Sequence, residues 1–86
     1  MHLILYSKPG CHLCEGLAEK LAGVTQFDFE LEIRDITTKD EWFNAYQYEV
    51  PVLTQKLDTQ EKLLPRLSPR ASVNQLEQML QKYLVT

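Results

Sequence analysis

The sequence predicts an α/β fold: a four-stranded mixed sheet flanked by helices on both faces. Short apolar runs of strand length alternate along the chain with stretches whose apolar residues recur at helical spacing. The chain has 86 residues, enough for one domain, and 44% of them are hydrophobic and 24% charged, as in ordinary globular proteins. The expected order of elements is β-α-β-α-β-β-α, within a single domain.

The first three elements are predicted in the N-terminal half. Residues 2–6 form an apolar run, which predicts a strand that ends at the turn-forming stretch 7–10. From Cys14 onward the apolar positions recur on one helical face, and Gly23 marks the end of that helix. Residues 27–34 then alternate apolar and charged side chains, which predicts a strand with one face in water. A right-handed crossover would place this strand parallel to the first.

A short second helix is predicted after Thr38. Thr38 and Glu41 have the spacing of a capping box, in which two side chains bond to backbone N–H groups at a helix start. The apolar stripe of this helix consists of Trp42, Phe43 and Tyr46. Both sides of so short a helix cannot be buried, so we expect these aromatic residues to belong to the core with one of them exposed.

The last third of the chain predicts a hairpin and a final helix. Residues 51–56 and 62–67 are strand-like runs joined by a polar stretch, and we expect them to form an antiparallel edge of the sheet. Ser72 and Gln75 form another capping box at the start of the final helix. The apolar face of that helix consists of Val73, Leu76, Met79, Leu80, Tyr83 and Leu84.

Charge and hydropathy exclude several classes of function. The chain has 9 basic and 12 acidic residues, a net charge of −3 and no basic cluster, so nucleic acid is not an expected partner. The apolar run at residues 3–6 is too short for a secretory signal or a membrane span, and no basic region precedes it. We therefore expect a cytoplasmic protein with no membrane partner.

The only two cysteines, Cys11 and Cys14, are the strongest candidates for chemistry. A disulfide that closes so short a loop stabilises a fold by only about 2 kcal/mol through chain entropy. The pair is therefore better suited to reacting than to stabilising the fold. In a reducing compartment it would rest as thiols unless it is catalytic, redox-sensing or bound to a metal.

The position of Cys11 favours reactivity. A thiol at the first turn of a helix meets unpaired N–H groups and the positive end of the helix dipole, and both favour the thiolate. Cys11 is therefore the predicted nucleophile, and Cys14, on the core side, would attack a mixed disulfide formed at Cys11. Lys8 would add positive charge nearby, whereas Glu15 would repel a thiolate.

The surroundings of the cysteines carry a family resemblance. Residues 9–14 read Pro-Gly-Cys-His-Leu-Cys between a strand and a helix, and Val50-Pro51 stands at the start of a later strand. Together these features resemble the glutaredoxin branch of the thioredoxin superfamily, nearest to a group of short glutaredoxin-like proteins with this motif. The resemblance covers essentially the whole chain and implies that residues 1–86 form a single thioredoxin-like domain of the glutaredoxin type.

The resemblance also implies roles for individual residues. Cys11 corresponds to the nucleophilic cysteine and Cys14 to the resolving cysteine of a redox-active disulfide. Pro51 corresponds to the cis-proline of the superfamily, which lies against the cysteine pair and turns the backbone of Val50 toward the substrate. Lys8 corresponds to a basic residue that approaches a carboxylate of glutathione, although a solvated loop lysine is the alternative. The implied function is that of a thiol-disulfide oxidoreductase acting on protein or glutathione mixed disulfides.

Two departures from the glutaredoxin pattern concern glutathione. Leu13 stands where glutaredoxins commonly have an aromatic residue, and residues 66–70 replace a Gly-Gly turn followed by an aspartate. Disulfide exchange itself needs only the two cysteines and the helix. We expect a monomer that requires no cofactor and takes its electrons from an external thiol, with glutathione as one candidate, or from a reductase.

Two alternatives from other classes remain open. A zinc ion needs four ligands, and the chain offers only Cys11, Cys14, His12 and His2, so no metal site is predicted within one chain. An iron–sulfur cluster shared between two chains would use the same thiolates. The third possibility is a redox-inactive interaction module. Arg66 and Arg70 are expected on the surface, with contact to an acidic substrate group as the alternative.

Overall fold

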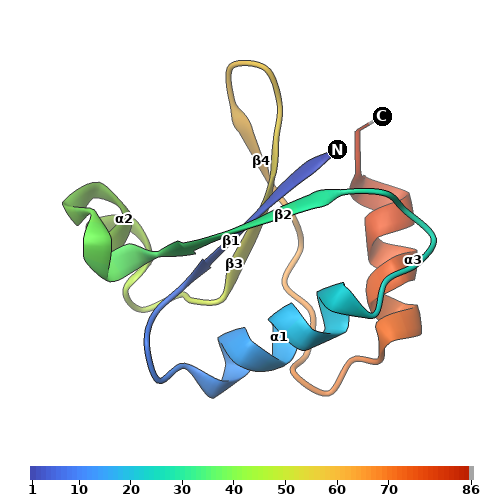
Figure 1. The fold of residues 1–86 in the computed structure, drawn as a ribbon, viewed down its shortest axis with the longest axis horizontal. Coiled ribbons are helices and arrows are strands. Elements are labelled where there is room, and N and C mark those ends of the chain that lie inside the picture. Colours follow the sequence, from blue (N-terminus) through green and yellow to red (C-terminus); the bar gives the residue numbers. More distant parts are fainter. Residues whose placement is uncertain (86) are drawn as a thin grey trace.

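The computed structural model describes residues 1–85, in which four strands and three α-helices follow the predicted order (Figure 1). The elements are β1 (His2–Ser7), α1 (His12–Ala22), β2 (Glu30–Asp35), the 3₁₀ turn η1 (Ile36–Thr38), α2 (Asp40–Tyr46), β3 (Val52–Lys56), β4 (Glu61–Leu63) and α3 (Val73–Tyr83). In this part of the chain no helix combines the length and the apolar character needed to cross a membrane.

The four strands form one mixed sheet in the order β2-β1-β3-β4. β1 pairs in parallel with β2, and Leu3 lies opposite Leu31. β3 pairs antiparallel with both β1 and β4. The expected parallel crossover and antiparallel hairpin are therefore confirmed. Tyr6, near the end of β1, lies opposite Val52, the first residue of β3, so the loop after β1 and the segment before β3 meet at one end of the sheet.

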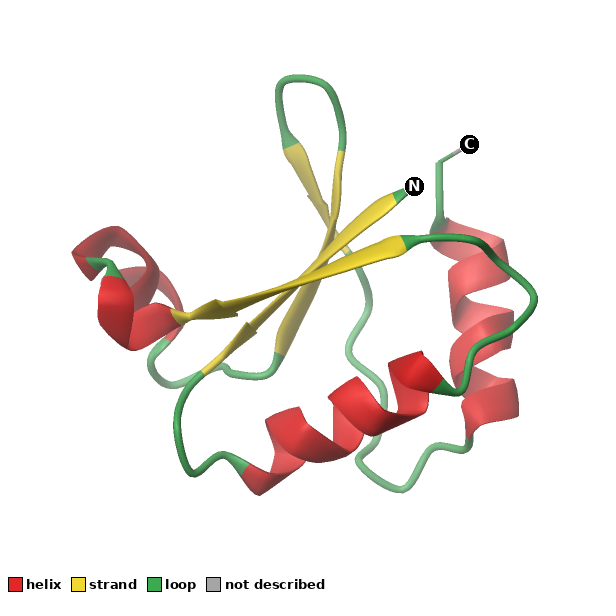
Figure 2. Ribbon diagram, viewed as in Figure 1, coloured by secondary structure: helices red, strands yellow, loops and turns green. Residues whose placement is uncertain are grey.

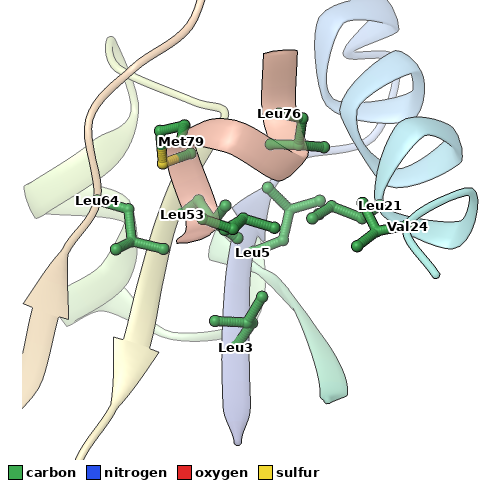
Figure 3. Packing of buried hydrophobic residues seen from close by; sticks show 9 residues of the cluster. Leu3, Leu5, Leu21, Val24, Leu53, Leu64, Leu76 and Met79 are labelled. Atoms are coloured by element: carbon green, nitrogen blue, oxygen red, sulfur yellow. The ribbon is translucent and has the colours of Figure 1, made fainter. Parts of the chain in front are cut away.

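Helices cover both faces of the sheet, as the sequence predicts: α1 and α3 lie on one face and α2 on the other (Figure 2). On the first face, side chains of α1 and α3 meet those of β1 and β3 in the main core (Figure 3). Its buried members are Leu3, Leu5, Leu21, Val24, Leu53, Leu64, Leu76, Met79 and Leu80. This packing fixes α1, the helix that follows Cys11, against the sheet.

The final helix begins as predicted. The Ser72 hydroxyl accepts a hydrogen bond from the Gln75 backbone N–H, and the Gln75 side chain accepts one from the Ser72 N–H. This reciprocal capping box satisfies two donors at the start of α3. The buried residues of α3 are Leu76, Met79 and Leu80, while Tyr83 is at the surface.

The second face of the sheet is built around Tyr6, which is almost completely buried. Its hydroxyl donates to Glu61 Oε1 at 2.6 Å and accepts from Arg34 Nη1 at 3.0 Å. The rings of Trp42 and Tyr46 in α2 pack against the Tyr6 ring, and the Arg34 guanidinium lies 4.9 Å from the Trp42 ring centre. Burial, reinforced by the Glu61 carboxylate, raises the pKa of Tyr6. A network of Tyr6 in β1, Arg34 in β2 and Glu61 in β4 therefore links three strands on the face that α2 covers.

The start of α2 differs from the prediction. Thr38 and Glu41 do not form a capping box: the N-cap residue is Lys39, and its side chain makes no capping hydrogen bond. Asp35 instead caps the preceding 3₁₀ turn, and its carboxylate accepts from the Thr37 backbone N–H at 2.9 Å. The Thr38 hydroxyl donates to the Asp35 carbonyl, so it is already used by the turn. One of the three aromatic residues of α2 was predicted to be exposed, and in the structure it is Phe43.

Two predicted strands are shorter in the structure. The strand expected over 27–34 begins at Glu30, and Ile33 on its expected apolar face is 56% exposed because β2 lies at the edge of the sheet. The strand expected over 62–67 is only β4, since Pro65 has no N–H to continue the ladder. The residues after β4 instead form a long connection to α3.

Gln55 ties the C-terminal segment to the sheet. Its side chain is buried in β3, where its amide Nε2 donates to the Val85 carbonyl at 2.6 Å. Its Oε1 accepts from the Val85 N–H at 2.8 Å. The side-chain amide thus pairs with the backbone of Val85 in the way that a neighbouring strand would.

Replacing Gln55 by methionine should lower the free energy of unfolding by about 1–2 kcal/mol, because two hydrogen bonds of about 1 kcal/mol each are lost while the side-chain volume is kept. Urea denaturation followed by circular dichroism measures this. The matched control is Gln78→Met at an exposed position of α3, which should leave stability unchanged. Equal stability of the two variants would show that the Val85 contact contributes nothing.

Candidate active site

The loop between β1 and α1 positions Cys11 at the start of the helix. Gly10 has a φ of +78°, in the left-handed region that favours glycine, and this turns the chain into the helix. The Cys11 N–H donates to the Lys8 carbonyl at 3.2 Å, which closes the turn. Cys11 is the N-cap of α1, so the helix begins at His12 rather than at Cys14, where the apolar periodicity starts.

The two cysteines are joined as a disulfide, with their Cα atoms 5.3 Å apart. Cys11 Sγ also accepts a hydrogen bond from the Cys14 backbone N–H at 3.2 Å. Cys14 is buried, with 3% of its surface exposed, whereas Cys11 is half-buried. Of the two sulfurs, only that of Cys11 belongs to a residue that a large substrate can approach, and it lies where helix N–H groups stabilise a thiolate.

The polar neighbours of the cysteines are exposed. The His12 ring is in solvent, with its Nδ1 3.5 Å from Glu15 Oε2. His2 is at the opposite end of β1, where it is hydrogen-bonded to Glu32. The structure therefore does not bring together the four candidate metal ligands of the sequence. Within residues 1–85 no group of three or more His, Cys, Asp or Glu side chains is arranged to hold a metal ion.

Val50 and Pro51 lie at the same end of the sheet as the cysteine loop. The peptide bond between them is cis, and the Val50 N–H donates to the Tyr46 carbonyl at 3.1 Å, which anchors the segment to the end of α2. Val52, the next residue, is buried opposite Tyr6. Cys14 and Pro51 are 37 residues apart in the sequence. The fold thus brings the Cys-x-x-Cys loop and the Val50-Pro51 step to the same end of the sheet.

Three basic side chains bind backbone carbonyl groups: Lys8 and Arg66, which contact residues shortly before Pro51, and Lys20 in the last turn of α1. Lys8 Nζ lies 3.4 Å from the carbonyl oxygen of Gln47, at the end of α2. Two further contacts join Lys20 Nζ to the Pro69 carbonyl at 2.6 Å and Arg66 Nη1 to the Glu49 carbonyl at 2.5 Å. Arg66 is exposed, as predicted, but it connects the segment after β4 to the segment before Pro51.

A groove of about 640 Å³ begins beside Leu13 and Pro51 and extends under the segment after β4. Its lining is mainly apolar and includes Leu13, Leu17, Pro51, Val52, Leu63, Leu64, Pro65, Leu67, Pro69, Leu76 and Met79. Tyr46 also lines it, and burial raises the pKa of that phenol.

The sequence did not predict this groove. A strand over 62–67 would have continued the sheet. In the structure the residues that connect β4 to α3 leave the sheet and line one side of the groove. Pro65 and Pro69 were the available signal, because two prolines four residues apart argue against a continued strand.

The comparison with protein families gives one match. The model of a family described as a glutaredoxin-like domain (DUF836) matches residues 2–81. None of the curated proteins is significantly similar to the chain.

Three solved structures are similar over nearly the whole chain. A structural genomics target protein from X. campestris, XcR50, is 27% identical with a TM-score of 0.65, and the match covers 95% of this chain and 99% of that one. Thioredoxin 1 from the thermophilic eubacterium Thermosipho africanus TCF52B is 19% identical with a TM-score of 0.63, over 96% and 93% of the two chains. A malarial protein is 17% identical with a TM-score of 0.65, over 98% and 97%. The expected thioredoxin-like fold is thereby confirmed.

Proposed function

Because the chain belongs to the glutaredoxin-like domain family, we propose that it is a thiol-disulfide oxidoreductase acting on protein or glutathione mixed disulfides. One observation carries the proposal: half-buried Cys11 caps α1 and is bonded to buried Cys14, at the same end of the sheet as Pro51. The family match and the thioredoxin-like fold support the same chemistry.

In the proposed reaction the reduced protein gives two electrons to the substrate disulfide. The Cys11 thiolate attacks one substrate sulfur, so a bond between Cys11 and the substrate forms while the substrate disulfide breaks, and the departing thiolate takes a proton from water. Cys14 then loses its proton and attacks Cys11 Sγ. This step forms the Cys11–Cys14 disulfide and releases the second substrate thiol. An external thiol such as glutathione, or a reductase, restores the two protein thiols.

Burial decides the order of the two cysteines. Cys14 faces the core and cannot reach the sulfur of a large molecule in solution, but Cys11 Sγ lies beside it. The Cys14 N–H that donates to Cys11 Sγ also stabilises negative charge on that sulfur. Cys11 therefore reacts with the substrate, and Cys14 reacts only with the Cys11 sulfur to which the substrate is by then bonded.

Two serine variants test these roles. Cys14→Ser should accumulate a covalent adduct at Cys11 when the reduced protein is mixed with a small aromatic disulfide, because the resolving thiol is missing. Cys11→Ser should accumulate none. Intact-protein mass spectrometry measures the fraction of adduct. Equal trapping by both variants would contradict the assignment, and iron or zinc in the purified wild-type protein would favour a metal carrier instead.

A further inference from the structure

We infer that the groove beside the cysteines selects polypeptide disulfides with an apolar residue next to the reacting cysteine, in preference to glutathione disulfides. The inference rests on the proposed function and names the substrate class of the same site. It follows from three observations: where the groove begins, which side chains line it, and what its basic neighbours bind.

The groove starts at the site of the chemistry. Leu13 lies between the two cysteines, and Pro51 stands at the same end of the sheet; both residues line the groove. A substrate sulfur bonded to Cys11 therefore carries its neighbouring residues to the mouth of the groove. From there the cavity extends to Leu63 of β4 and to the segment that follows it.

The apolar lining is partly open to solvent before any substrate binds. Leu13 is 48% exposed and Leu63 is 68% exposed, which are high values for leucine side chains at the rim of an apolar cavity. Covering them with an apolar substrate side chain removes apolar surface of both partners from water. Leu63 belongs to an edge strand of three residues, and most of its side chain does not pack against the core.

The charges around the groove do not match glutathione. Glutathione carries two carboxylates and one ammonium group, so a site that recognises it needs cations aimed at the ligand. The basic side chains beside this groove are instead bonded to backbone carbonyls of the protein itself: Lys8 to Gln47, Lys20 to Pro69 and Arg66 to Glu49.

Carboxylates stand beside these cations. Glu49 and Glu61 line the groove together with Lys20 and Arg66, so the groove offers no net positive charge to the two carboxylates of glutathione. An uncharged, apolar polypeptide segment needs no such charge. Charge complementarity therefore favours the polypeptide as the occupant.

The test compares three disulfides in a single turnover of the pre-reduced protein, so that no external reductant is required. The probes are glutathione and two short peptides, each disulfide-linked through its cysteine to the same aromatic thiol so that the leaving group is constant. In the two peptides the cysteine is flanked either by leucine or by serine. We expect the second-order rate constant for the leucine peptide to exceed those for the serine peptide and for glutathione by about 10-fold or more, the discrimination that small apolar groups give.

Leu63→Ser should reduce the ratio of the leucine-peptide rate to the serine-peptide rate by about 5-fold, and Leu13→Ser gives an independent second variant at the other end of the groove. The matched control is Ile33→Ser, an equally apolar and 56% exposed residue of β2 outside the groove, which should leave the ratio unchanged. Circular dichroism establishes that each variant is folded.

The outcomes separate this inference from the proposed function. Equal rates for the three probes, faster reaction with glutathione, or an unchanged ratio in both leucine variants would overturn the inference while leaving disulfide exchange intact. No reaction with any probe, together with no adduct on Cys14→Ser, would overturn the proposed function and the inference with it.

Discussion

Replacing Cys11 by serine should lower the rate of disulfide reduction by at least about 10³-fold, because a serine hydroxyl is not ionised near neutral pH and cannot replace the thiolate. The loss should be chemical rather than structural. Serine is among the best N-cap residues, so Ser Oγ can accept the Cys14 N–H hydrogen bond that Cys11 Sγ accepts now. The rate is measured in a single turnover of the reduced protein with a small aromatic disulfide, and thermal unfolding checks the fold.

Cys14→Ser is the matched control for this prediction. It removes the resolving thiol but keeps the nucleophile and the helix start, so the first step should proceed at close to the wild-type rate. If Cys11→Ser instead retained more than about a tenth of the wild-type rate, the half-buried sulfur would not be the nucleophile. The buried Cys14 would then have to react directly, which would require α1 to open.

Replacing Arg34 by methionine should lower the free energy of unfolding at neutral pH by about 2–3 kcal/mol, since one member of a partly buried charged network is lost. Arg34 bridges Glu32, Glu61 and the Tyr6 hydroxyl, and it stacks on the Trp42 ring. Methionine keeps the apolar contact with Trp42 but leaves the two carboxylates without their shared cation. The matched control is Arg70→Met on the exposed segment before α3, which should change stability little.

The Arg34 prediction also has a pH signature. The hydrogen bond from Arg34 lowers the pKa of Glu32 below its ordinary value of 4.5. A carboxyl group whose pKa is lower in the folded state stabilises the fold above its unfolded pKa and loses that contribution as the pH falls through the folded value. The stability difference between wild type and Arg34→Met should therefore shrink below about pH 4.5. Urea denaturation at about pH 7 and about pH 3 measures this, and a constant difference would contradict the role of Glu32.

Much of the fold followed from local sequence patterns. The capping box of Ser72 and Gln75 and the helical apolar face after it are properties of neighbouring residues, and both were predicted. The Cys-x-x-Cys motif and the Val50-Pro51 step likewise identified the positions that the structure brings to one end of the sheet. The parallel pairing of β1 and β2 followed from the handedness of crossovers.

The remainder depended on contacts between distant residues. Thr38 has the sequence of a helix cap, but in the structure it belongs to the 3₁₀ turn that Asp35 caps, and its hydroxyl donates to the Asp35 carbonyl. Lys20 and Arg66, which line the groove, bind carbonyl groups 49 and 17 residues away in the sequence, and no local sequence pattern predicts such a bond. Ile33 has the alternation of a core residue, yet its exposure depends on which strand lies at the edge.

The two outer strands also bear on aggregation. An edge strand with free N–H and C=O groups is a template to which another chain can add, and charged side chains or short strands weaken that template. On β2 the edge carries Glu30, Glu32 and Arg34 within six residues. On the other side β4 has only three residues, and Pro65 follows two positions later. Neither border of the sheet therefore offers a long, uncharged stretch on which fibril-like stacking of further chains could begin.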